Sequence, residues 1–146
     1  MPSQSPRVAI TGIGVVSPYG VGRERFWTHV SRGCSATRAI TEFDTSDLTC
    51  RVAAAVPDDA LARAEANGHG PDERHLNGRA DPRRYAKVSR IAVLAAREAL
   101  RDSGLDPAMP DLGVVVGSGA GGIDVAERQY GEFYSGDHHR VSPYAI

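Results

Sequence analysis

The chain has 146 residues, of which 41% are hydrophobic and 24% charged, and its formal net charge is −1. This length fits one domain or part of a larger one, and the near-neutral charge excludes a general attraction to nucleic acid or anionic membranes. The apolar runs are too short to span a bilayer, and the N-terminus lacks the basic and apolar regions of a secretory signal.

The first half of the chain is predicted to contain two strands and two helices. Arg7–Val16 has the composition of a buried strand that ends in a glycine-rich turn, where the glycines would allow close backbone packing. Apolar residues at helical spacing predict a helix over Arg23–Ser31. We expect a short strand over Arg51–Val56 and then a short helix from Pro57 to about Ala66.

The second half repeats this alternation. Residues 67–82 are polar and turn-rich, which indicates a surface excursion. A broad apolar face predicts a long helix over Arg83–Ser103, with Gly104 as its left-handed C-cap. Leu112–Val116 indicates a buried strand, and the pattern from Ile123 to about Tyr134 indicates a helix.

Alternating strands and helices predict an α/β layer architecture with parallel strands. Such a pattern should continue into a further strand, but the last residues, VSPYAI, supply no closing element. We therefore expect residues 1–146 to be the N-terminal portion of a larger protein.

The segment Val114–Gly122 spells G-x-G-x-x-G directly after a run of β-branched residues. This is the dinucleotide-binding fingerprint, which also needs a second strand and an acidic residue about 20 residues later. Asp137 stands near that distance but in a polar loop, and Pro143 interrupts the only apolar stretch that follows. The pattern therefore disfavours a nucleotide site. It leaves two alternatives open, a tight turn or a backbone wall beside a ligand channel.

Several motifs together resemble one family. They are RVAITGIGVVSPYG, FDTSDLTCRVAAAV, RRYAKVSRIAVLAAREALRDSGLD, VVVGSGAGGIDVAE and VSPYAI, in this order. Their order and spacing resemble the N-terminal half of a β-ketoacyl-acyl carrier protein synthase, the elongating ketosynthase of the thiolase superfamily. The resemblance covers residues 7–146 and implies a thiolase-like αβαβα layered fold, present here as an incomplete N-terminal portion, in a protein that is usually dimeric.

The resemblance implies a decarboxylative Claisen condensation in fatty acid or type II polyketide biosynthesis. In the family, an acyl group on a cysteine thiolate is attacked by the carbanion from malonyl-carrier protein, and two histidines assist. These catalytic residues would lie beyond Ile146, so we expect the 146-residue chain alone to be inactive and no catalytic residue to fall within it. No cofactor is implied.

The cysteines and histidines that are present do not suggest another chemistry. Cys34 and Cys50 have no base nearby in the sequence, so we interpret both as structural. Two cysteines without metal-ligand spacing also fit a reducing cytoplasm better than a disulfide scaffold. The adjacent His138 and His139 are poorly placed to converge on one ion, and we predict no metal site.

Two family functions would fall within this chain. The first is an acyl pocket, implied at Gly119, Ala120, Gly121 and Ala145. Relatives often carry a larger gating side chain at the position of Ala120 and an aromatic at that of Ala145. A wider pocket for long or rigid acyl chains would follow, unless neighbouring side chains refill the space.

The second is docking of the acidic acyl carrier protein, for which a synthase needs a local basic patch. The resemblance implies such a patch at Arg83, Arg84, His139 and Arg140. The alternative is an ordinary solvated surface charge.

Three functional hypotheses remain distinguishable. The first is the condensing enzyme, acting as a homodimer or as a heterodimer with a ketosynthase-like subunit. The second is a non-catalytic subunit of the same fold, similar to a chain length factor. The third is a nucleotide-binding module, which titration with NAD(P) would test. The first is preferred, in a cytoplasmic protein whose partners are the carrier protein, a second ketosynthase-like subunit and the missing C-terminal portion.

Overall fold

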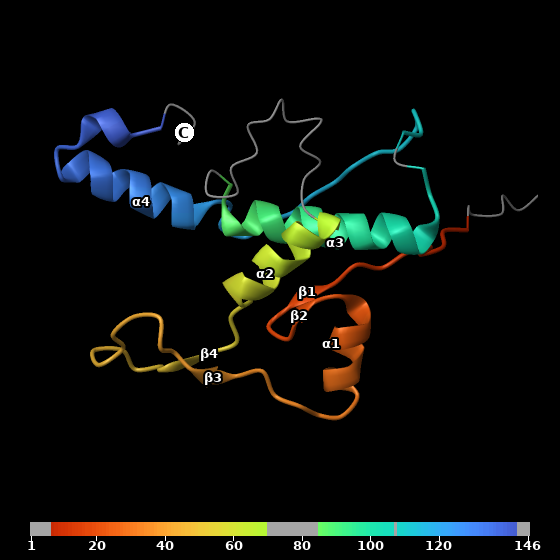
Figure 1. Cartoon of the computed structure of the whole chain (residues 1–146), viewed down its shortest axis with the longest axis horizontal. Coiled ribbons are helices and arrows are strands. Elements are labelled where there is room, and N and C mark those ends of the chain that lie inside the picture. Colours follow the sequence, from red (N-terminus) through yellow and green to blue (C-terminus); the bar gives the residue numbers. More distant parts are fainter. Residues whose placement is uncertain (1–6, 70–84, 107, 143–146) are drawn as a thin grey trace, which may run out of the picture.

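The computed structural model describes residues 7–69, 85–106 and 108–142. Helix α3 (Lys87–Ser103) runs through the middle of the molecule, and much of the first half of the chain packs against it (Figure 1). The other described elements are, in chain order, β1 (Val16–Ser17), β2 (Gly20–Val21), α1 (Arg23–Val30), β3 (Arg38–Ala39), β4 (Val52–Ala53), α2 (Asp58–Ala64), the kinked turn η1 (Glu65–His69), α4 (Ile123–Tyr134) and the 3-10 helix η3 (His138–Arg140).

The structure confirms the predicted helices. Helix α1 begins where the apolar pattern begins, α2 lies inside its predicted range, and α4 has the predicted bounds. Helix α3 ends at Gly104, whose φ of 68° makes it the expected left-handed C-cap. This helix was predicted to begin at Arg83, but it begins at Lys87, because Ala86 has an extended backbone (ψ of 146°). Arg83 and Arg84 themselves lie outside the described residues.

The prediction of parallel strands is wrong for the described residues, in which the strand pairs are antiparallel. Val16 pairs with Val21 in the first hairpin, and Arg38 pairs with Ala53 in the second. Of the strand predicted over residues 7–16 only its last residue is paired, and of that over residues 51–56 only Val52–Ala53. The first pair joins strands separated by residues 18–19, and the second joins strands separated by residues 40–51.

The strand predicted over Leu112–Val116 is absent from the described structure. Its valines are largely exposed, Val115 by 98%, and Val8 in the first extended segment is exposed by 93%. β-branched residues favour an extended backbone, but a strand also needs a neighbour that accepts and donates its backbone hydrogen bonds. Among the described residues, neither Val8 nor the segment Leu112–Val116 is paired with another strand.

The small core lies where α2 crosses α3. Leu61 of α2 and Leu94 of α3 are 0% and 2% exposed. A bidentate ion pair joins the same two regions, with Arg90 Nε and Nη2 at 2.7 and 2.8 Å from the Glu65 carboxylate oxygens. Because both side chains are mostly buried, this bidentate ion pair fixes the orientation of the α2–η1 segment on α3.

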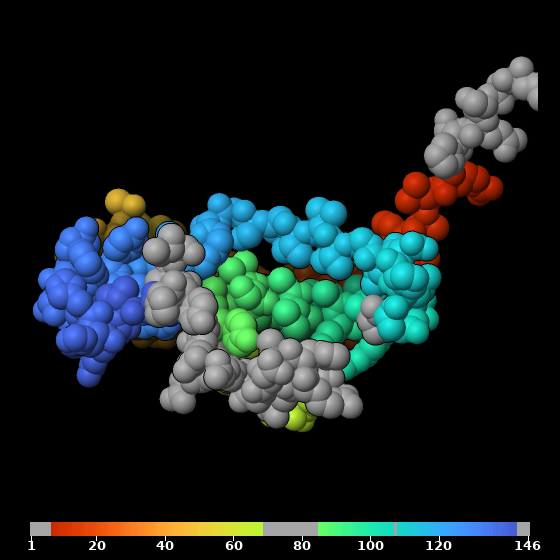
Figure 2. Space-filling view, turned by 90° about the horizontal axis from the view of Figure 1, so that it is seen from above, coloured from red at the N-terminus to blue at the C-terminus, as the bar shows by residue number. Residues whose placement is uncertain are grey.

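The molecule is elongated. Figure 2 shows α4 and η3 at one end and the N-terminal segment from residue 7 at the other, with the extended segment before α4 lying along α3. No helix in the described part of the chain is long and apolar enough to cross a membrane.

Candidate functional site

The glycine-rich turn of the first segment lies directly against α3. A Cβ atom built on Gly12 would stand 2.2 Å from the carbonyl oxygen of Ala99, and one built on Gly14 only 1.8 Å from that of Ala95. No side chain fits at these distances. The close backbone packing predicted for these glycines is therefore confirmed.

Two carboxylates on α3, one helical turn apart, bind the backbone of this glycine-rich turn and form what we call the carboxylate clamp. Glu98 accepts the backbone N–H groups of Val15 and Arg23 through its two oxygens, each at 2.8 Å. Asp102 accepts the N–H of Ile13 at 3.0 Å and forms an ion pair with the Arg23 guanidinium. The Ile13 N–H, and then Arg23, hold the pKa of Asp102 below its ordinary value. Sequence analysis missed this clamp, whose only signal is an acidic pair four residues apart on a helix.

The second glycine motif forms an open bend. The backbone N–H of Gly121 donates to Ser118 Oγ at 3.0 Å, and Gly121 has a φ of 59°, a left-handed conformation that favours glycine. Gly119, Ala120 and Gly121, which were assigned to an acyl pocket, are consecutive exposed residues of this bend. Around Gly119 and Gly121 a Cβ atom would meet nothing within 4 Å.

The end of this bend is fixed to the start of α3. A Cβ atom on Gly122 would lie 2.9 Å from Cβ of Ala86. One residue into α4, Asp124 accepts the backbone N–H of Lys87 at 2.9 Å. Because the first N–H groups of a helix have no partner within it, α4 supplies the cap of α3. The bend is thus open on one side and rigidly held at its end.

The predicted docking residues divide into two groups. His139 and Arg140 lie in η3, where both are exposed, and Arg140 pairs with Asp137 at 3.4 Å. They follow α4, whereas the glycine bend precedes it, and the helix between them is about 18 Å long. Arg83, Arg84 and Ala145 lie outside the described residues.

The two cysteines are exposed and free. The carbonyl oxygen of Cys34 accepts the Tyr19 hydroxyl, and the Tyr19 ring stacks on His29 at 4.6 Å between ring centroids. Among the described residues, no group of three or more histidine, cysteine or acidic side chains is placed to hold a metal ion.

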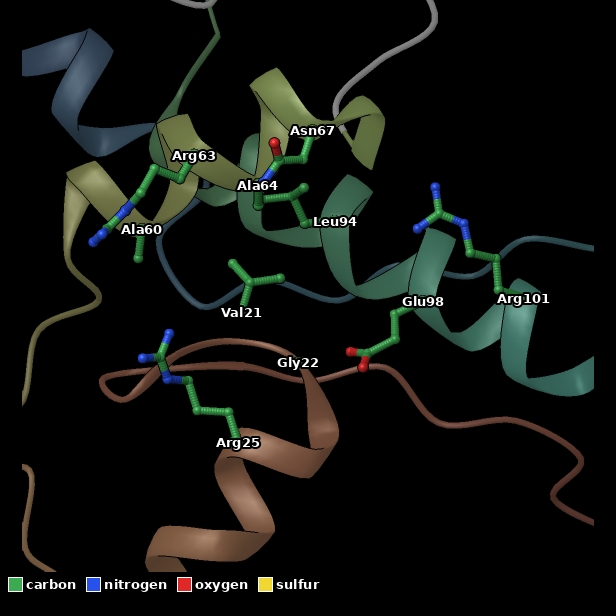
Figure 3. A pocket seen from close by; sticks show the side chains of 10 residues that line it. All are labelled: Val21, Gly22, Arg25, Ala60, Arg63, Ala64, Asn67, Leu94, Glu98 and Arg101. Carbon is green, nitrogen blue, oxygen red and sulfur yellow. The ribbon is translucent and has the colours of Figure 1, made fainter.

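A cleft that sequence analysis did not predict lies between the first hairpin and the helices. Its volume is about 520 Å³ (Figure 3). Its lining comes from β2, α1, α2, η1 and α3 and comprises Val21, Gly22, Arg25, Ala60, Arg63, Ala64, Asn67, Leu94, Glu98 and Arg101. This cleft is built from parts of the chain other than the glycine bend and η3.

Comparison with known proteins decides the family. Residues 5–146 match the family described as "Beta-ketoacyl synthase, N-terminal domain". The chain belongs to this family. The resemblance inferred from the motifs is thereby confirmed.

Two curated relatives from Streptomyces glaucescens belong to one system. The chain is 36% identical over 133 residues to the ketoacyl synthase alpha subunit of the tetracenomycin polyketide synthase, which covers 89% of this chain and 28% of that protein. It is 34% identical over 141 residues to the beta subunit, covering 94% and 31%. The chain thus spans about a third of the length of the curated relatives it matches.

A solved structure supports the fold. The ishigamide ketosynthase/chain length factor superposes with a TM-score of 0.60 at 30% identity, covering 93% of this chain and 32% of the other. The thiolase-like α/β fold class is therefore confirmed, as a partial unit, although the strand pairing expected within it is not formed in the described residues.

Proposed function

We propose that this chain is the N-terminal portion of a 3-oxoacyl-acyl carrier protein synthase of polyketide assembly. The complete protein would extend an acyl chain by decarboxylative Claisen condensation with malonyl-carrier protein. The observation that carries this proposal is the family match over residues 5–146, together with relatives that are named polyketide ketosynthase subunits. The chain alone would be inactive, because the family nucleophile and histidines have no counterparts within it.

The alternative is a non-catalytic partner subunit. It is favoured by the similarity to the beta subunit of the tetracenomycin synthase, at 34% identity, which is nearly that of the alpha subunit. Both proposals place a second ketosynthase-like subunit beside this one. They differ in whether a cysteine follows at the family's nucleophile position.

One experiment separates the two. The full-length polypeptide is purified alone and together with its ketosynthase-like partner, and condensation is measured with acyl- and malonyl-carrier protein. The enzyme form should become acylated on a cysteine, which intact-mass measurement detects. Activity that depends on this subunit without any acylation of it would identify the partner subunit instead.

Within the proposed enzyme, the glycine bend would be the backbone wall of the acyl channel. Support comes from the exposure of Gly119, Ala120 and Gly121 and from the anchoring of the bend to α3 through Asp124. A small side chain at Ala120 would leave the channel wide, and Ala145 would widen it further.

This assignment predicts a change in chain-length preference. In the full-length protein, Ala120→Phe should lower kcat/KM for long acyl primers at least tenfold and leave that for acetyl primers nearly unchanged, because a bulky side chain blocks only the distal channel. Ala126→Val, a smaller enlargement inside α4, serves as the control. An equal loss for all primers from Ala120→Phe would reject the assignment.

Carrier docking is proposed at Arg83, Arg84, His139 and Arg140, because the carrier is acidic and these side chains are basic. The exposure of His139 and Arg140 supports it. Charge reversal at Arg83, Arg84 and Arg140 together should raise KM for carrier-bound substrate and leave kcat for a small thioester substrate unchanged. An unaltered KM would show that these residues are only solvated charges.

A further inference from the structure

The cleft between the first hairpin and the helices has the size of a small-molecule site. Its volume of about 520 Å³ lies within the range of pockets that hold such ligands. The cleft includes neither the glycine bend nor η3. The class of ligand that it could bind follows from the chemistry of the residues that form its floor and its rim.

The floor is apolar. Val21 of β2, Ala60 and Ala64 of α2 and Leu94 of α3 face the cleft (Figure 3). Leu94 belongs to the core and is 2% exposed, so this floor is a fixed part of the fold. It offers a hydrocarbon chain or ring a surface on which to be removed from water.

The rim is basic and comes from three different helices. Arg25 lies on α1, Arg63 on α2 and Arg101 on α3, and Figure 3 shows the guanidinium groups of Arg25 and Arg63 on the same side of the cleft. Arg63 pairs with Asp59, but this pair is largely exposed, at 72% and 68%. Arg101 donates to the carbonyl oxygen of Gly68 at 3.3 Å.

Arg25 has the most unused binding capacity. In the part of the chain that the structure describes, no hydrogen bond or ion pair of its guanidinium is found. The one carboxylate lining the cleft is that of Glu98, and its oxygens already accept the backbone N–H groups of Val15 and Arg23. Glu98 therefore does not pair with the rim, which retains donors suited to an oxyanion.

We propose that this cleft binds an amphipathic anion, a carboxylate or phosphate ester on an apolar chain or ring. The apolar part lies on the floor formed by Leu94 and its neighbours. The anionic group lies between Arg25 and Arg63. The Arg25 guanidinium can bind two of its oxygens, whereas Arg63, whose Nε and Nη2 already donate to Asp59, offers its remaining Nη1 donors. This site is distinct from the proposed acyl channel and does not depend on the proposed condensing activity.

The test uses four probes on the full-length protein, by isothermal titration calorimetry. Octanoate and octyl phosphate carry both features, octanol only the apolar part and inorganic phosphate only the charge. We expect saturable binding of at least one of the first two, tenfold or more tighter than that of octanol or inorganic phosphate. The stronger of the two amphiphiles identifies the anionic group that the cleft prefers.

Matched variants locate the binding. Arg25→Gln and Arg63→Gln should each lower the affinity for the tighter-binding amphiphile about tenfold, which is the usual effect of losing a charge-assisted hydrogen bond. Ala60→Leu should lower this affinity by a similar factor, because the larger side chain fills the apolar floor without changing the charge. Arg32→Gln, an exposed arginine outside the cleft, should have no effect, and thermal melting confirms that all variants fold.

Three results would overturn the proposal. The first is no saturable binding of either amphiphile. The second is inorganic phosphate binding as tightly as octyl phosphate, which would mean simple surface charge. The third is an equal effect of Arg25→Gln and Arg32→Gln. All three can be read without any measurement of condensation, so they do not depend on whether the proposed function holds.

Discussion

Gly14 is a point at which a single side chain would disrupt the fold. Its position leaves no room for a Cβ atom beside the Ala95 carbonyl oxygen, at 1.8 Å. The neighbouring N–H of Val15 is at the same time bound by Glu98. At the scale of the residue, the glycine-rich turn is thus held close to α3 because Gly14 has no side chain and because Glu98 on α3 binds the next backbone N–H.

Gly14→Ala should therefore lower the free energy of unfolding by roughly 1–3 kcal/mol or more, because the turn must move away from α3. Gly131→Ala is the matched control. Gly131 lies inside α4 with open space around it, so alanine there should stabilise by about 0.5–1 kcal/mol. Chemical denaturation measures both. Equal effects of the two substitutions would contradict the packing described for Gly14.

Asp102 should make stability depend on pH in acid. Its pKa is below the ordinary 3.8 in the folded chain, so the unfolded state binds the proton more readily. The contribution of Asp102 is fully present well above that ordinary value and is lost as pH falls through the folded-state pKa. Asp102→Asn should flatten the decline in unfolding free energy from about pH 5 downward. An identical decline in both proteins would exclude this role.

At the scale of the element, α3 and α4 depend on one another. Asp124 in the first turn of α4 caps the first N–H of α3, at Lys87. Lys87 Nζ in turn lies 2.7 Å from the Val56 carbonyl oxygen and 2.9 Å from Asp58 Oδ1. The connection before α2, the start of α3 and the end of the glycine bend therefore meet at Lys87.

Asp124→Ala should cost about 0.5–2 kcal/mol, as the loss of a helix cap does. It should also speed amide hydrogen exchange in the first turn of α3. Glu127→Ala, on an exposed position of the same helix, is the control and should change neither quantity appreciably. Unchanged exchange at the start of α3 in Asp124→Ala would show that the cap is dispensable.

The helices could be predicted from the sequence, but of the strands only short parts of two, at Val16 and at Val52–Ala53, form where they were predicted. Helix α4 was predicted with its observed bounds, because a helix satisfies its hydrogen bonds within one segment and shows its apolar face at a local spacing. Leu112–Val116 was predicted as a strand from composition alone. A strand forms only with a neighbour, and local sequence does not say whether or where that neighbour lies.

At the scale of the whole molecule, much apolar surface is uncovered. Val8 and Ile10 in the first extended segment and Val114, Val115 and Val116 before the glycine bend are exposed by 69–98%. Exposed apolar segments of this kind are association surfaces. They are also unpaired strand-forming sequences, which can add to other chains.

The 146-residue chain produced alone should therefore self-associate and bind the dye anilinonaphthalene sulfonate. Light scattering as a function of concentration measures the first property, and fluorescence the second. Replacing Val115 by lysine should reduce association, because a charge on an unpaired edge blocks strand addition. A monodisperse monomer that melts cooperatively would contradict this prediction.

The sequence by itself determined the helices, the family and the role of the first glycines, because periodicity, caps and ordered motifs are local properties. Only the tertiary structure decided the carboxylate clamp and the basic cleft. Val15 and Glu98 are 83 residues apart in the chain, and Arg25, Arg63 and Arg101 come from three helices. Glu98 and each of the three arginines, taken singly, look like ordinary surface charges. Their function depends on which helix folds against which turn, and no local pattern records that.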